Sequence, residues 1–259
     1  MFFLLYLLSG MLAGLLAGLL GIGGGIIIVP ALLYIFTLQH MHPDITMHMA
    51  AGTSLAIMVL TSISSICAHH YRGNVYWPIF LKLVPSIIVG VIIGATCAHF
   101  VNTRIIEIVF GIFLLLVSLR IFFHLTPSGH KELPSGLTLN SAGLIIGGKS
   151  GFLGVGGGSI IIPFLLYFNI PMHKASGTCA ACSFIIALVG SISFILLGLK
   201  VNAGPNYLGY IYLPAFINVA LTSIIFAPIG AWLGSKFSVT VLKKIFALFL
   251  FLTSISLLW

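Results

Sequence analysis

Two glycine clusters of nearly the same sequence are the features of this chain best suited to chemistry. Gly21-Ile22-Gly23-Gly24-Gly25 and Gly154-Val155-Gly156-Gly157-Gly158 each interrupt an apolar stretch. Irregular backbone survives in a membrane only when it is buried in protein or lines a wet cavity, so such glycines indicate a ligand. A short apolar helix follows each cluster, and its N-terminus carries unpaired N–H groups and about half a positive charge. The pattern predicts an oxyanion pocket, with close helix packing as the alternative.

Charged and hydroxyl side chains near the clusters support an anion as the ligand. Lys149 precedes Gly154 by five residues inside an apolar segment, so it either faces the ligand or extends to the membrane surface. The chain has only three acidic residues, all near the ends of apolar segments, which disfavours a cation. The expected substrate contacts are Gly23, Gly24, Gly25, Thr53, Ser54, Lys149, Gly156, Gly157, Gly158, Thr178 and Cys179.

A second pair of matched blocks contains hydroxyl groups and histidines. Gly-Thr-Ser at 52–54 and Gly-Thr-Cys at 177–179 have hydroxyls that either donate to an anion or bond back to their own helix carbonyls. His48 and His173 precede these blocks by four residues each. Histidine carries protons near neutral pH, so the pairing predicts proton coupling, with interfacial histidines as the alternative.

The remaining reactive residues favour neither an enzyme nor a resident metal. A loop at 40–49 is rich in His and Met, and its His40, His42, Met47 and His48 suggest an alternative function as a soft-metal permease or sensor. The four cysteines lie in apolar segments, which gives no case for disulfides. Three acidic residues near span ends cannot assemble a nucleophile, a base and an orienting acid, so we expect no catalytic residue, no cofactor and no metal site.

The composition identifies the elements that must position these residues as membrane helices. The 259 residues are 60% apolar and 5% charged, with 11 Lys and Arg against 3 Asp and Glu. Soluble domains carry about 25% charged residues, and several charge-free runs here are long enough for a span of roughly 20 residues. The formal charge of +8 comes from scattered residues without a basic patch. We therefore expect contact with the lipid bilayer and a small anion, and none with nucleic acid.

The apolar segments occur in two matched sets. We expect spans near 2–37, 46–68, 77–100, 103–123, 139–168, 175–198, 207–234 and 239–258, of which the first and fifth are too long for one crossing. The glycine clusters match at an offset of 133 residues, the Gly-Thr blocks at 125, and Gly73, Pro78 and Gly94 match Gly209, Pro214 and Gly230 at 136. The fold class is therefore an all-α integral membrane protein of about 7–8 transmembrane helices in two homologous four-span repeats, each with a glycine-broken first helix. The expected boundaries are 1–125, a polar linker at 126–138, and 139–259.

The charges of the loops do not predict the orientation of the chain in the membrane when successive connections are assigned alternately to its two sides. Arg72, Arg120, Lys131 and Lys200 then fall on one side, and Arg104, Lys174, Lys236, Lys243 and Lys244 on the other. That split gives no usable bias under the positive-inside rule. Whether the repeats are parallel or inverted stays open, as does the oligomeric state.

The ordered blocks resemble the TauE/SafE sulfite exporter family, also called the 4-toluene sulfonate uptake permeases. The residues that carry the resemblance are Gly18 to Pro30, Ala51 to Leu55, Arg72 to Trp77, Gly151 to Pro163, Ser176 to Thr178, Tyr210 to Pro214 and Ala227 to Gly230. The resemblance implies a seven-to-eight-span carrier of the bacterial inner membrane, built by duplication, whose substrates are small sulfur-containing anions such as sulfite or an organosulfonate. We expect the protein to export such an anion by alternating access, with the anion held between the two glycine clusters. Tyr76 stands where relatives commonly have an acidic residue, and Lys149 is not a general feature of the family.

Overall fold

The structure is a computed structural model that describes residues 2–20, 24–123, 135–201, 204–236 and 239–259. Its elements in chain order are α1 (Phe2–Leu20), α2 (Gly25–Leu38), η1 (Pro43–Ile45), α3 (Thr46–Tyr71), α4 (Trp77–His99), α5 (Thr103–Phe122), α6 (Gly136–Leu153), α7 (Gly158–Tyr167), α8 (Met172–Gly198), β1 (Tyr207–Leu208), β2 (Ile211–Tyr212), α9 (Leu213–Lys236) and α10 (Val239–Leu258). The expected all-α membrane fold is confirmed, since five of these helices (α3, α4, α5, α8 and the described part of α9) are long and apolar enough to span a membrane.

The first expected span is a helical hairpin that returns to the end of the bundle from which it starts. Tyr6, near the start of α1, donates from its hydroxyl to Oε1 of Gln39, which caps α2, over 3.0 Å. The fifth expected span is likewise divided into α6 and α7. Thr138, in the first turn of α6, lines the same cavity as Tyr167, the last residue of α7, so these two ends also lie together.

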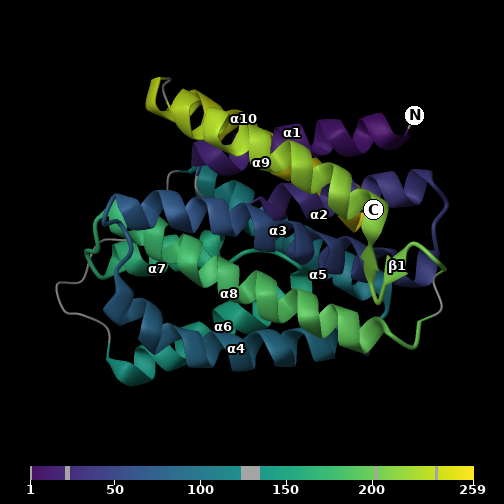
Figure 1. The fold of residues 1–259 in the computed structure, drawn as a ribbon, viewed down its shortest axis with the longest axis horizontal. Coiled ribbons are helices and arrows are strands. Elements are labelled where there is room, and N and C mark those ends of the chain that lie inside the picture. The colour runs from purple at the N-terminus through teal and green to yellow at the C-terminus, as the bar shows by residue number, and fades with distance from the viewer. Residues whose placement is uncertain (1, 21–23, 124–134, 202–203, 237–238) are drawn as a thin grey trace.

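The two hairpins start from opposite ends of the bundle. We call the end at which α1, α3 and α9 begin end A, and the end at which α4, α6 and α8 begin end B. Figure 1 shows the labelled N-terminus, C-terminus and β1 together toward one end, and α7 toward the other. Each hairpin therefore enters the bundle from its own side and turns back inside it.

Glycines allow the first helix of each hairpin to pack closely along a distant span. Gly10 of α1 lies against Val219 and Thr222 of α9, whereas Gly143 of α6 lies against Leu83 and Ser86 of α4. Gly143 follows Gly10 by 133 positions in the sequence. Val219 and Thr222 follow Leu83 and Ser86 by 136 positions. Small residues of this kind let membrane helices approach backbone to backbone.

The helices α3 and α8 run antiparallel through the middle of the bundle (Figure 1). Gly52 of α3 faces Phe194 near the end of α8, and Gly190 of α8 faces Leu55 of α3. On another side α5 and α10 also run antiparallel, because Arg104 at the start of α5 donates to the carbonyl of Leu258 at the end of α10. Residues of α3 and α8 flank the tips of both hairpins.

Candidate functional site

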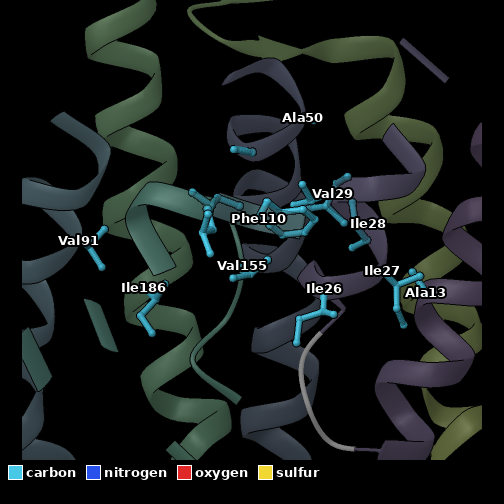
Figure 2. Packing of buried hydrophobic residues seen from close by; sticks show 14 of the residues in the cluster. Ala13, Ile26, Ile27, Ile28, Val29, Ala50, Val91, Phe110, Val155 and Ile186 are labelled. Atoms are coloured by element: carbon cyan, nitrogen blue, oxygen red, sulfur yellow. The ribbon is translucent and has the colours of Figure 1, made fainter. Parts of the chain in front are cut away.

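The tips of the two hairpins meet in the interior of the bundle. A Cβ atom on Gly25 would lie 3.0 Å from Cα of Val155 and 3.2 Å from the backbone N of Gly156, so the two glycine clusters are in direct contact. Figure 2 shows Val155 between Ile26 of α2 and Ile186 of α8. Helix α2 begins at Gly25 after its N-cap Gly24, and α7 begins at Gly158 after its N-cap Gly157. Two helix N-termini therefore converge on one point. Gly23 lies outside the described residues.

One face of α3 closes this point from the side. Ala51 contacts Gly154, which has a φ of +71° that favours glycine, and the thioether of Met58 contacts both Gly25 and Gly156. Ser54 follows Ala51 by three residues and precedes Met58 by four, so helical periodicity places it on the same face. Its Oγ is fully buried and has no hydrogen-bond partner in the described part of the chain. Buried hydroxyls are normally bonded, so Ser54 is the first candidate for a ligand contact.

Lys149 brings a positive charge to the N-terminal end of α7. Its Nζ is 3.2 Å from Oγ of Ser159 and 3.5 Å from the carbonyl oxygen of Gly156, and it lies 4.5 Å from the centre of the Phe113 ring. Among the described residues the only ion pair is Arg104 with Glu107, so no carboxylate balances Lys149. A cation beside the positive end of a helix is unfavourable unless an anion joins them. Lys149 thus points to the glycine clusters rather than to the membrane surface.

Arg120 is a site residue that sequence reasoning treated only as a loop charge. Its Nη1 donates over 3.2 Å to the carbonyl of Ser159. In an α-helix that carbonyl would accept from the residue four positions later, but this residue is Pro163, which has no N–H. Arg120 therefore replaces the missing donor. The signal in the sequence was an arginine within the apolar segment at 103–123.

Ser183 of α8 lies beside Gly156, as Met58 does, and Cys179 lies next to Ser183 on the same helix. Their Sγ and Oγ atoms are 3.9 Å apart, and a Cβ on Gly156 would lie 3.4 Å from Oγ of Ser183. Cys179 is fully buried and occupies the position in its block that Ser54 occupies in the other. Ser183 and Met58 were not expected from the sequence, because only the packing of α3 against α8 directs them to the glycines.

The threonines of the matched blocks connect the two halves of the chain. Oγ1 of Thr53 accepts from the backbone N–H of Tyr212 over 3.0 Å, and Oγ1 of Thr178 accepts from that of Tyr76 over 2.9 Å. Thr178 also donates to the carbonyl of Lys174, four residues back on its own helix, over 2.7 Å. Both hydroxyls are therefore already engaged, each with a backbone N–H from the other half of the chain.

His48 and His173 lie in different surroundings, and the structure does not bring them together. His48 is buried, with Nε2 2.9 Å from the carbonyl oxygen of Ala98, and its ring is stacked on Tyr210. His173 is exposed at the start of α8. Burial raises the pKa of the Tyr210 phenol, so its hydroxyl keeps a proton and can donate to Nδ1 of His99, 2.9 Å away.

Two residues of the alternative metal site have surroundings that do not suggest metal ligation. Met47 is fully buried, and the ring of His42 faces Tyr207, with the two ring centres 6.1 Å apart. The described residues contain no group of three or more His, Cys, Asp or Glu placed to hold a metal ion.

Comparison with known proteins gives a consistent result over the whole chain. The family model described as "Sulfite exporter TauE/SafE" matches residues 6–257. A "Probable membrane transporter protein" of Haemophilus influenzae is 40% identical over 261 residues, which cover 99% of this chain and 98% of that protein. The "Probable membrane transporter protein YunE" of Bacillus subtilis is 26% identical over 264 residues, 94% of this chain and 90% of its own length. "Probable membrane transporter protein MJ0441" of Methanocaldococcus jannaschii is 28% identical over 231 residues, 87% of this chain and 80% of its own.

Proposed function

The chain belongs to the TauE/SafE sulfite exporter family, and from the geometry of its hairpin tips we propose that it is a secondary transporter that exports a small sulfur-containing anion. Sulfite and organosulfonates are the proposed substrates, and the bacterial inner membrane is the proposed location. That the protein is a membrane transporter rather than an enzyme follows from the family and from the names of its relatives. The proposal that the substrate is an anion rests on the geometry of the hairpin tips.

The observation that carries the proposal is the convergence of two helix N-termini at a glycine contact. The first N–H groups of α2 and α7 have no partner within their own helices, and each helix contributes about half a positive charge at this end. Lys149 adds an amine donor beside these N–H groups, and the described residues place no carboxylate with it. Such a site attracts an oxyanion and repels metal cations.

The roles of the expected site residues follow from their contacts. We assign anion binding to the N–H groups of the glycine clusters, to the unpartnered hydroxyl of Ser54, to Lys149 and to Cys179 beside Ser183. Thr53 and Thr178 position the site, because their hydroxyls hold the backbone in front of α9 and α4. Met58 fills the contact between Gly25 and Gly156, so its flexible side chain must move when an anion binds.

We further propose that the two halves are inverted repeats and that transport proceeds by alternating access. Contacts in one half recur in the other half between corresponding residues. Gly10 and Gly143 correspond at the offset of the glycine clusters, and Thr53 and Thr178 correspond at the offset of the Gly-Thr blocks. The hairpins enter from opposite ends, as expected for an inverted relation. Rocking one half against the other around a fixed central site is the usual mechanism in such transporters. His48 and His173 are the proposed proton carriers.

Binding of the purified protein in detergent to a panel of anions tests the proposal. A ligand that binds only the folded protein raises its unfolding temperature by mass action. We expect sulfite, isethionate or sulfoacetate to stabilise the protein, and acetate and Ag⁺ to have no effect. Stabilisation by Ag⁺ alone would refute the anion site and favour the soft-metal alternative at residues 40–49. Failure of every sulfur anion to stabilise the protein or to cross reconstituted vesicles would refute the proposed substrate class.

A further inference from the structure

A cavity of about 430 Å³ lies at end B between α5, α6 and α7. Arg120 of α5 and Thr138 of α6 line it, together with residues of α7 and its C-cap: Ile160, Pro163, Phe164, Tyr167 and Phe168. Arg120 is the only charged side chain among the lining residues. A half-buried arginine in a mostly apolar cavity requires polar partners for its N–H groups, and the carbonyl of Ser159 accepts from only one of them.

A single residue, Ser159, connects the arginine of the cavity to Lys149 beside the glycine clusters. Arg120 donates to the carbonyl of Ser159, and Lys149 donates to the hydroxyl of the same residue, each over 3.2 Å. Two cations thus meet on the second residue of α7, close to its positive N-terminal end, and neither is paired with a carboxylate among the described residues. An anion between them would relieve this repulsion.

We propose that the cavity is an outer oxyanion subsite in which Arg120 binds the anion on its way to or from Lys149. A guanidinium presents five N–H donors in a planar fork, so the bond to Ser159 leaves donors for bidentate binding of an oxyanion. Two sources can supply this chemistry: the transported anion, as the subsite of the proposed transporter, or the phosphate of a lipid headgroup at end B.

The test compares wild type, Arg120→Gln and Arg120→Lys in vesicles of phosphatidylcholine with and without phosphatidylglycerol. Glutamine can still donate to Ser159, so this variant removes the charge while keeping the helix contact, and Lys82→Gln removes an exposed charge at the same end as the control. If the subsite serves transport, Arg120→Gln raises the KM for sulfite about two- to fivefold at low salt, the difference fades at high salt, and lysine partly restores it. If it serves lipid, phosphatidylglycerol raises the unfolding temperature of wild type but not of Arg120→Gln.

Arg120→Gln equal to wild type in both measurements would overturn the subsite. If wild type carries no sulfur anion at all, the proposed function fails, whereas the lipid measurement still decides whether Arg120 binds an oxyanion.

The distribution of charge between the two ends carries a second, independent inference. With the hairpins returning to their own sides, end B has the described cations Arg72, Lys82, Arg120, Lys174 and Lys244, and no described acidic residue lies there. End A has Arg104 and Lys200 together with Asp44 and Glu107, so the described side chains there have no net charge. Alternate counting of connections missed this bias because it treated each hairpin as a crossing.

We infer that end B faces the cytoplasm and lies against the anionic headgroups of the inner leaflet. Loops rich in Lys and Arg stay on the cytoplasmic side, and anionic lipids of that leaflet attract basic residues near the membrane surface. The hairpin α6–α7, which carries Lys149, then enters from the cytoplasm, and both described chain ends lie outside.

Two exposed aromatic residues provide a matched test. Tyr71 at end B is 89% exposed and Phe100 at end A is 80% exposed. Each is replaced by cysteine in a chain whose exposed Cys67 and Cys97 are serine, and intact cells are treated with a membrane-impermeant maleimide. We expect labelling of Phe100→Cys in intact cells and of Tyr71→Cys only after permeabilisation; the reverse pattern, or labelling of both in intact cells, would overturn the orientation. If neither reacts, alkaline phosphatase fused after Trp259 decides, since it must be active when end A is outside.

Discussion

We predict that replacement of Lys149 by methionine has two effects of opposite sign, one on sulfite affinity and one on stability. Methionine keeps the length and apolar stem of the side chain but removes the ammonium group that contacts Ser159 and Gly156. We expect the variant to bind sulfite more weakly and yet to unfold at a higher temperature when no ligand is present. Loss of affinity together with a gain in stability is typical of a charge that is held in place for a ligand.

The magnitude follows from the geometry at the start of α7. Since Nζ is 3.5 Å from the carbonyl oxygen of Gly156, an oxyanion on the neighbouring N–H groups would lie at about 5 Å from the charge, where an effective dielectric of about 20 gives about 3 kcal/mol. Because the lysine is only half-buried, about 2 kcal/mol is the more realistic loss, a roughly 30-fold rise in Kd. In the empty protein, removal of an unpaired intramembrane cation is favourable.

The assay is the sulfite dependence of the unfolding temperature in detergent, which reports affinity and ligand-free stability from the same titration. Lys149→Arg should retain most of the affinity, and Lys82→Met, at an exposed position on α4, should change neither quantity. Unchanged sulfite affinity in Lys149→Met would refute the reasoning, because the ammonium would then be satisfied by Ser159 and the Phe113 ring alone.

Three further predictions concern the tips and the matched blocks. Gly25→Ala should abolish sulfite flux in vesicles, because the new Cβ would press on Met58, Val155 and Gly156. Gly136→Ala, where no atom of the described residues lies within 4 Å, should retain flux. Thr53→Val should lower the free energy of unfolding by about 1–2 kcal/mol, measured by denaturant titration, because the N–H of Tyr212 loses its acceptor; Thr53→Ser should recover most of it, and equal stability of all three proteins would contradict the role. The double variant His48→Gln/His173→Gln should flatten the pH dependence of sulfite flux between about pH 5 and 8, and an unchanged profile would exclude these histidines as proton carriers.

Hydrophobicity and turn residues were sufficient to predict the helices, because a bilayer requires long apolar segments with few breaks. Expected segments such as 46–68 and 103–123 correspond to α3 and α5 within a few residues. The excessive length of the segments at 2–37 and 139–168 indicated a break, but not that the chain turns back there. The hydrophobic pattern of one helix does not indicate whether the next helix continues across the bundle or returns to the same end.

The site was predictable where its residues stand out in type from the apolar sequence around them. Repeated glycines marked the hairpin tips, and a lysine in an apolar segment marked the charge. Met58, Ser183 and Arg120 were not found, because their roles depend on how α3, α8 and α5 pack around the tips. Thr53 and Thr178 show the reverse case: their matched positions suggested a ligand, but the partner of each is backbone from the other half of the chain.

The packing of α1 along α9 and of α6 along α4 makes the two halves interdependent during synthesis. The glycine face of α1 is made first, but its partner around Val219 and Thr222 is made more than 200 residues later. Until α9 has been synthesised, Gly10 and Gly14 of the first hairpin must lie against lipid or an insertion factor. A chain stopped after α5 therefore has no completed site, and two separately expressed halves should assemble into one transporter only by exchanging their hairpins.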